Sequence, residues 1–155
     1  MVSVDKLTEL CDGTALNTGV AGTYNLGSID LGSTTPGDVS VCPTYIVIAM
    51  KTSATSGGSA TAKFRVVTGT SSNPSTSTGE VLLQTPTFAL SELTAGQRLY
   101  AVPLPAATEA VPYLRYIALQ QTTSVAAFTG GTVDCYLTDK VPTHAILADG
   151  APTPA

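Results

Sequence analysis

Short apolar runs alternate with turn-forming residues along nearly the whole chain, and this punctuation constrains its fold more than any other feature. Apolar runs of about four to eight residues, bounded by Gly, Pro, Ser, Thr and Asn, are typical of β-strands. A helical spacing of apolar residues occurs only briefly, between Val4 and Cys11, where it leaves room for one or two turns. The frequent Thr residues also favour strands, because their β-branch fits a pleated sheet. The pattern predicts an all-β protein.

Two runs are apolar on both faces of the strand that each forms. Successive side chains of a strand point to opposite sides, and residues 45–51 place apolar groups on both. Residues 113–120 do the same, with Arg115 as the exception. The core of a small two-layer sandwich covers only one side of such a strand, so we expect a neighbouring protomer to cover the other. The candidate contact residues, toward a protomer or another partner, are Ile46, Ile48, Tyr113 and Ile117.

Other runs alternate apolar with polar residues, as strands with one solvent-facing side do. Together with the runs above they predict about seven or eight strands. Short strands joined by Gly and Pro turns favour an antiparallel β-sandwich, and the jelly roll is our preferred version. The clearest inward-facing sets are Ala60, Ala62, Phe64 and Val66 in one run and Val133, Cys135 and Leu137 in another.

The two ends of the chain carry little periodic apolar surface. Ordering a residue costs about 1 to 2 kcal/mol, and such segments bury too little to offset that cost within the domain. We therefore divide the chain into an N-terminal arm over residues 1–23, a sandwich domain over residues 24–140 and a C-terminal tail over residues 141–155. Both ends are expected to rest on an external surface and not on the sandwich core.

Composition limits the kinds of partner. Only 12% of the 155 residues are charged, against about 25% in typical domains, while 43% are hydrophobic, so part of the apolar surface is expected to meet another protein. A net charge of −4 argues against binding to nucleic acid phosphates. No run approaches the about 20 apolar residues that cross a bilayer, and residues 1–10 carry charges where a signal peptide needs an apolar block. We expect neither nucleic acid nor membrane as a partner.

No arrangement of reactive residues indicates an enzyme. His144 is the single histidine and lies in the proline-rich tail, outside the predicted strands. Cys11, Cys42 and Cys135 lack the close pairing of a zinc site and are expected to be free thiols in a reducing cytoplasm. Spacing alone leaves open whether scattered carboxylates converge in space, but solvated charges are the favoured interpretation. We expect no catalytic residue, no metal site and no cofactor. The scattered carboxylates are Asp30, Asp38, Glu80, Glu92, Asp134 and Asp139.

Several short blocks occur in an order that resembles a known family. Over about residues 28–138 the chain resembles the jelly-roll capsid cement, or decoration, proteins of tailed phages. No single block is specific, and the resemblance rests on their order. The blocks are Ser28–Gly32, Tyr45–Ile48, Leu93–Leu99 ahead of Val102–Pro105, Tyr113–Tyr116 and Phe128–Gly131.

The resemblance implies a homo-oligomer, usually a trimer, on the outer capsid surface of a virion assembled in the host cytoplasm. Its partner is then the major capsid protein, and no reaction is catalysed. The chain departs from the family in its tail from Val141 onward and in the length of the loop at residues 68–79. The alternative is a receptor- or glycan-binding sandwich domain of a phage fibre or cell-surface protein. The lack of Trp and the aromatic-poor loop count against it.

Overall fold

The computed structural model of the chain describes residues 8–32, 44–106 and 112–139. Within them the chain forms strands β1 to β8, with a short 3-10 helix, η2 (Leu90–Glu92), between β5 and β6. The strands are β1 (Glu9–Ala15), β2 (Gly22–Asp30), β3 (Tyr45–Ser56), β4 (Thr61–Gly69), β5 (Glu80–Ala89), β6 (Arg98–Pro103), β7 (Tyr116–Ser124) and β8 (Phe128–Thr138).

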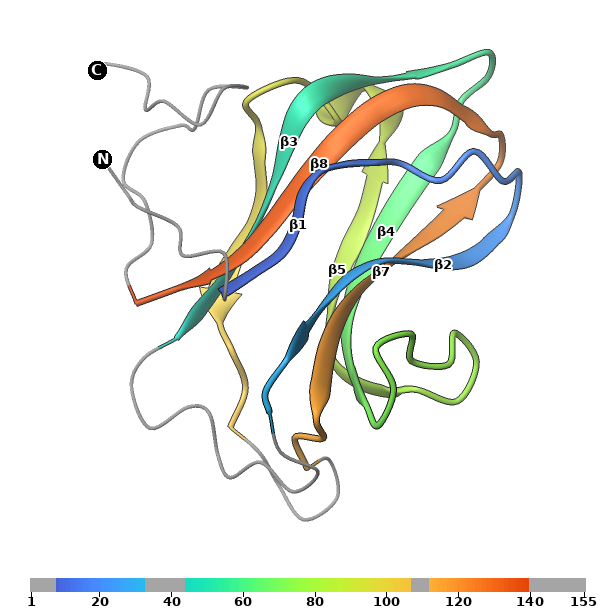
Figure 1. Cartoon of the computed structure of the whole chain (residues 1–155). Coiled ribbons are helices and arrows are strands. Elements are labelled where there is room, and N and C mark those ends of the chain that lie inside the picture. The colour runs from blue at the N-terminus through green and yellow to red at the C-terminus, as the bar shows by residue number, and fades with distance from the viewer. Residues whose placement is uncertain (1–7, 33–43, 107–111, 140–155) are drawn as a thin grey trace.

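The strands form two antiparallel four-stranded sheets that pack face to face (Figure 1). One sheet has the order β1-β8-β3-β6 and the other the order β2-β7-β4-β5. The chain passes from one sheet to the other at most connections, so neighbours within a sheet are mostly distant in sequence. Eight strands in this order make a jelly roll. The predicted fold class, an antiparallel β-sandwich of jelly-roll type, is confirmed.

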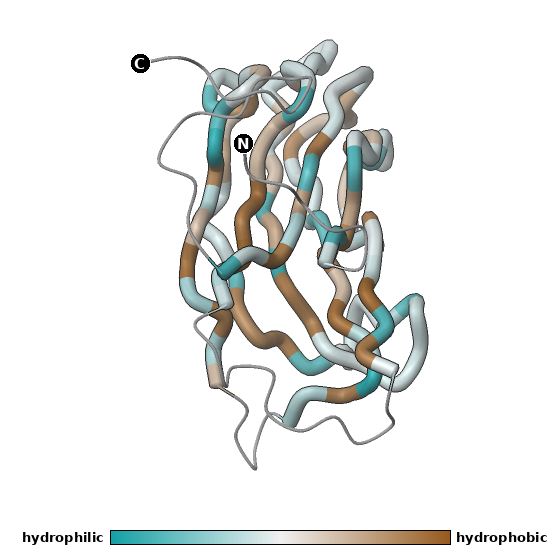
Figure 2. The backbone as a smooth tube through the Cα atoms, turned by 60° about the vertical axis from the view of Figure 1, so that its left-hand side comes forward, coloured by the Kyte–Doolittle hydropathy of each residue, from teal (hydrophilic) through white to brown (hydrophobic). Residues whose placement is uncertain are grey.

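Facing apolar rows of the two sheets make the core. The alternation predicted for residues 60–66 is confirmed, since Ala60, Ala62, Phe64 and Val66 are all fully buried. Figure 2 shows hydrophobic segments along the strands and paler or hydrophilic ones in the loops. Other strands contribute inward residues at every second position. These are Ile46, Ile48 and Met50 of β3, Ile117 and Leu119 of β7, and Val133 and Cys135 of β8.

The N-terminal segment is not wholly an arm, and the prediction for residues 1–23 is wrong where β1 forms. Residues 9–15 pair antiparallel with β8, and Leu10, Cys11 and Leu16 are buried in the core. Two register shifts interrupt β1, which removes the regular alternation that identifies a strand in the sequence. The helical turns allowed near Cys11 are replaced there by this strand. Residues 1–7 and the tail at residues 141–155 lie outside the described residues.

Gly27 allows β1 to lie close against β2. A Cβ atom at this position would lie 1.9 Å from the backbone oxygen of Leu10, a distance that real Cβ atoms do not reach. Gly27 also follows a register shift in the pairing of β2 with β7. A backbone carbonyl in a paired strand cannot move aside as a flexible side chain can. The position of β1 in the sandwich therefore depends on the absence of a side chain at residue 27.

We predict that Gly27→Ala destabilises the fold by about 2 kcal/mol or more, because overpacking against fixed backbone is costly. Urea unfolding measures this loss as a lower midpoint. Gly57→Ala is the matched control, since a Cβ there meets nothing within 4 Å. Equal midpoints for the two variants would contradict the close approach of β1 and β2.

Candidate interaction surface

The four predicted contact residues face the inside of the sandwich. Ile46, Ile48 and Ile117 are fully buried, Tyr113 is 2% exposed, and all four belong to the core between the sheets. The Tyr113 hydroxyl donates a hydrogen bond to the Pro105 carbonyl oxygen. The prediction that these side chains touch a partner is wrong, because alternation separates two faces of a strand without saying which one turns inward.

The outer sides of the same strands are covered within the single chain. On β3, Val47 and Ala49 point away from the core and are nevertheless 0% and 3% exposed. On the other sheet, Val67 of β4 lies opposite Ala118 of β7, and both are fully buried outside the core cluster. A neighbouring protomer is therefore not needed to bury these positions. The two strands that are apolar on both faces therefore give no reason to expect an oligomer, and that part of the prediction is wrong.

The chain's own loop at residues 70–79, between β4 and β5, covers the outer side of β4 and β7. Figure 1 shows it in light green, turned back beside the lower ends of these strands. Pro74 in this loop is buried, and a Cβ added at Gly79 would lie 3.8 Å from the Cβ of Val67. The loop is therefore a fixed part of the molecular surface.

Three polar side chains, each from a different strand, hold the backbone of the 70–79 loop. Asn25 Nδ2 of β2 donates to the Pro74 oxygen at 3.0 Å, and Gln120 Nε2 of β7 donates to the same oxygen at 3.1 Å. The Arg65 guanidinium of β4 donates to the Thr76 oxygen. The three holders are themselves linked, because Gln120 accepts from Arg65 Nε at 2.8 Å and donates to Asn25 Oδ1 at 2.8 Å.

Gln120 is the centre of this network, and its burial explains why the network is complete. Its side chain is 0% exposed, and an unpaired buried amide costs about 1 to 3 kcal/mol. The sequence predicts neither Gln120 nor Arg65 as an anchor of this loop. The available signal is a long polar side chain, Gln120, directly after the apolar run at residues 116–119.

The 70–79 loop also has internal hydrogen bonds. The Ser75 hydroxyl accepts from the Thr78 amide at 3.1 Å, and the Gly79 amide donates to the Ser75 carbonyl at 3.1 Å. No residue of this loop is charged. A loop that is already ordered in this way would lose little conformational entropy in a binding event.

Two small surface pockets lie in the described part of the chain. A pocket of about 210 Å³ lies beside the 70–79 loop and is lined by Ser and Thr residues together with Leu114. Another, of about 220 Å³, lies near η2, where Glu92 and Arg98 contribute to its wall. The Glu92 carboxylate already accepts the Ala89 amide at 2.7 Å, which caps the 3-10 turn. This carboxylate thus has a structural role.

The buried thiols are poor nucleophiles. Cys11 and Cys135 lie opposite each other in β1 and β8 and are both free. Burial raises the pKa of Cys11 to about 12 and that of Cys135 well above its ordinary value, so both remain protonated near neutral pH. Residues Cys42 and His144 lie outside the described residues.

Carboxylates do not gather around a metal site in the described part of the chain. There, no group of three or more His, Cys, Asp or Glu residues could hold a metal ion. Asp12 instead pairs with Lys51 at 2.7 Å, and Asp134 accepts the Gly13 amide at 2.5 Å.

Among the described residues, no helix has the length and apolar character to cross a membrane.

A bidentate ion pair fixes the end of β2. Arg115 Nε and one terminal nitrogen each donate to an Asp30 carboxylate oxygen at 2.9 Å. These bonds, together with the Gly32 amide, lower the pKa of Asp30 to about 2. The Leu31 amide also donates to the Arg115 carbonyl at 2.7 Å. Arg115, the polar exception in the run at residues 113–120, therefore tethers the chain before β7 to β2.

Comparison with known protein families gives a match over most of the chain. The family model Bbp16 matches residues 10–137, which cover nearly all of the eight strands. No curated protein matches the chain. The matched region includes β1 from its second residue, in agreement with the place of this strand in the sandwich.

The Asp30 ion pair predicts a specific pH dependence. A carboxyl group whose folded pKa lies below its unfolded value stabilises the protein above pH of about 4, and that stabilisation is lost as pH falls toward about 2. Asp30→Asn should therefore lower the urea midpoint at pH 7, and the difference from wild type should vanish near pH 2. Glu80→Gln removes an exposed carboxylate from β5 as the control. A difference that is constant with pH would contradict the ion pair.

The polar network predicts that Gln120→Leu releases the 70–79 loop. The variant leaves the Pro74 oxygen and Arg65 short of partners, and we expect a loss of about 2 to 3 kcal/mol in urea unfolding. Hydrogen exchange should accelerate in the loop. Thr122→Val, on the same face of β7, is the control, since Thr122 bonds Thr23 and not the loop. Unchanged exchange in the loop of Gln120→Leu would refute the anchoring role.

Proposed function

The chain belongs to the Bbp16 family, and we propose that it is a structural virion protein that binds the outer surface of a tailed-phage head. In this role it stabilises contacts between subunits of the major capsid protein and catalyses no reaction. The sequence resemblance to cement proteins motivates the proposal. The structural observation that supports it is the filled interior of the sandwich, which leaves the outer surface available for binding another protein.

The space between the two sheets is occupied by large side chains. Phe64, Phe128, Met50, Leu119 and Tyr113 are among the largest fully buried ones, and they come from both sheets and from the segment before β7. Jelly rolls that bind small ligands inside need an unfilled interior. A sandwich with a filled interior is suited to bind a partner through its edges and loops.

The outer surface has two properties that suit binding to another protein. It is poor in charge, with 12% charged residues in the whole chain, so contact removes few ionic groups from water. Its 70–79 loop is held by Asn25, Arg65 and Gln120 before any partner arrives. Both properties lower the cost of association.

A capsid converts modest contacts into stability. A protein that binds only the intact shell adds its binding free energy to that shell, which opposes opening. The shell repeats one site many times, and a homo-oligomer, usually a trimer in the resembled family, can hold several subunits together at high effective concentration. Individually weak contacts are therefore enough.

Sedimentation with undecorated capsids of the phage that encodes the chain tests this proposal. We expect the protein to pellet with capsids in a saturable manner and to raise the temperature at which they open, whereas the protein spun alone stays in the supernatant. Recovery only in the supernatant, at concentrations well above micromolar, would contradict the proposal. Saturable binding on a glycan array without capsid binding would favour the receptor-binding alternative instead.

A further inference from the structure

Three connections meet at one end of the sandwich, and we call them together the valine tip: residues 17–21, 57–60 and 124–127. Figure 1 shows the β1–β2, β3–β4 and β7–β8 turns side by side at its upper right. The Asn17 amide donates to Gln121 Oε1 at 2.9 Å, and the Ser56 hydroxyl donates to the Ala127 oxygen at 2.6 Å. The three connections thus form one continuous surface.

The valine tip exposes apolar side chains. Val20 is 63% exposed and Val125 is 69% exposed, and they are two of the three large hydrophobic residues exposed in the described part of the chain. Gly22 pairs with Thr123 across β2 and β7, and each valine lies two residues beyond that pair. The two side chains therefore sit on adjoining turns.

Val125 adopts a backbone conformation that its side chain disfavours. Its φ is 75°, and the Ala126 amide donates to the Ser124 oxygen at 3.0 Å, which makes a γ-turn with a positive φ at the centre. A β-branched residue in this region is a genuine outlier, whereas glycine adopts it without strain. Glycine would relieve this backbone strain, so the valine side chain costs stability at this position.

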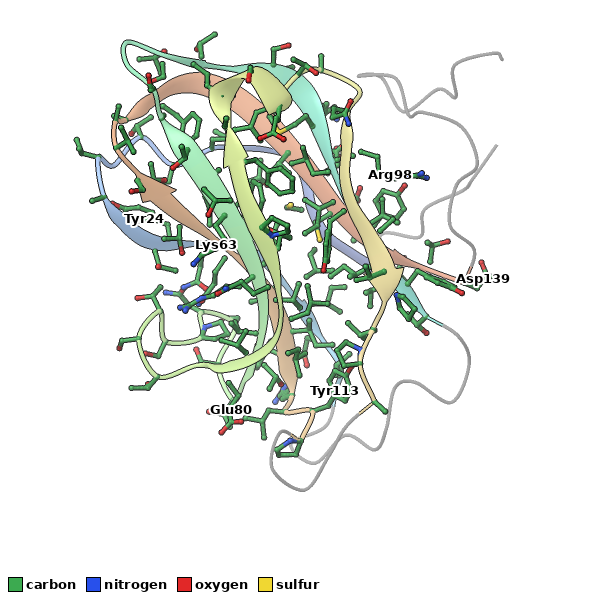
Figure 3. The ribbon with its side chains drawn as sticks, turned by 180° about the vertical axis from the view of Figure 1, so that it is seen from behind. Tyr24, Lys63, Glu80, Arg98, Tyr113 and Asp139 are labelled. Atoms are coloured by element: carbon green, nitrogen blue, oxygen red, sulfur yellow. The ribbon has the colours of Figure 1, made fainter. Side chains whose placement is uncertain are left out.

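The valine tip carries no charge. Residues 13–29, 52–62 and 116–133 contain no Asp, Glu, Lys, Arg or His, although the whole chain has 18 charged residues of the first four kinds, 7 basic and 11 acidic. The Tyr24 hydroxyl supports the tip by donating to the Ala21 oxygen at 2.9 Å. Of the charged residues labelled in Figure 3, Lys63 is drawn nearest to Tyr24, while Glu80, Arg98 and Asp139 lie farther away. Burying this surface against a partner desolvates no ion within it.

We infer that the valine tip is the surface that docks on an uncharged patch of the major capsid protein, an inference that rests on the proposed function. Nucleic acid is excluded as the occupant because the tip offers no cation to phosphate. A second copy of the chain is disfavoured, since a stable dimer buries about 800 Å² per partner and the tip offers two exposed valines among small residues. A contact of this size is effective where a lattice repeats it.

The test uses Val20→Asp and Val125→Asp in sedimentation with undecorated capsids, with Val81→Asp as the matched control. Val81 is the third exposed valine, 40% exposed, and lies on β5 outside the tip. The two tip variants place a charge in the contact and should weaken capsid binding at least tenfold, while Val81→Asp binds like wild type. Val125→Gly separates binding from folding: its melting temperature should rise, yet its capsid binding should fall.

Three results would overturn the inference. If wild type pellets with capsids and both tip variants do so equally well, the protein docks through another surface and the proposed function stands. If the tip variants instead break up an oligomer seen by light scattering without capsids, the tip joins copies of the chain. If wild type itself fails to bind capsids, the proposed function falls together with the inference.

Discussion

Apolar contact between the two sheets is the interaction on which the rest of the structure depends. Each sheet presents a row of inward side chains, and fully buried residues such as Phe64, Leu119 and Phe128 fill the space between them. β1 belongs to this contact through Leu10 and Cys11, and Gly27 lets it approach β2 closely enough to do so. With the interior filled, the loops and outer faces are what remain for function.

On the outer face of the β2-β7-β4-β5 sheet, polar side chains fix the conformation of the loop that lies over it. Gln120 and Arg65 point away from the core, where they hold the backbone of the 70–79 loop. Buried polar networks are stabilising only when every member has its partners, and here each amide and guanidinium contact is directed at a specific oxygen. The result is a loop with a defined shape, although its Ser- and Thr-rich sequence predicts no regular structure.

Local periodicity predicts the fold but not the surface. Alternation at residues 60–66 indicates a strand with one buried side, and the structure confirms it, because that signal depends only on neighbours in the sequence. At residues 132–138, Val133 and Cys135 are buried and Leu137 is partly buried, but Tyr136 on the opposite side is buried as well. The prediction for the candidate contact residues is wrong because the direction in which a side chain of a strand points is set by distant parts of the chain. Whether Ile46 or Val47 turns inward, and whether a loop covers Ala118, depends on strands far away in the chain. The irregular register of β1 likewise hides a strand whose pairing with β8 spans most of the sequence.

We propose that this packed jelly roll binds an external surface, with its uncharged end toward the partner. Cryo-electron microscopy of undecorated capsids incubated with the purified protein tests this claim most directly. We predict added density for an eight-stranded sandwich on the outer surface, with the turns around Val20 and Val125 against the shell. Capsids without added density, or a sandwich seated by a different face, would contradict it.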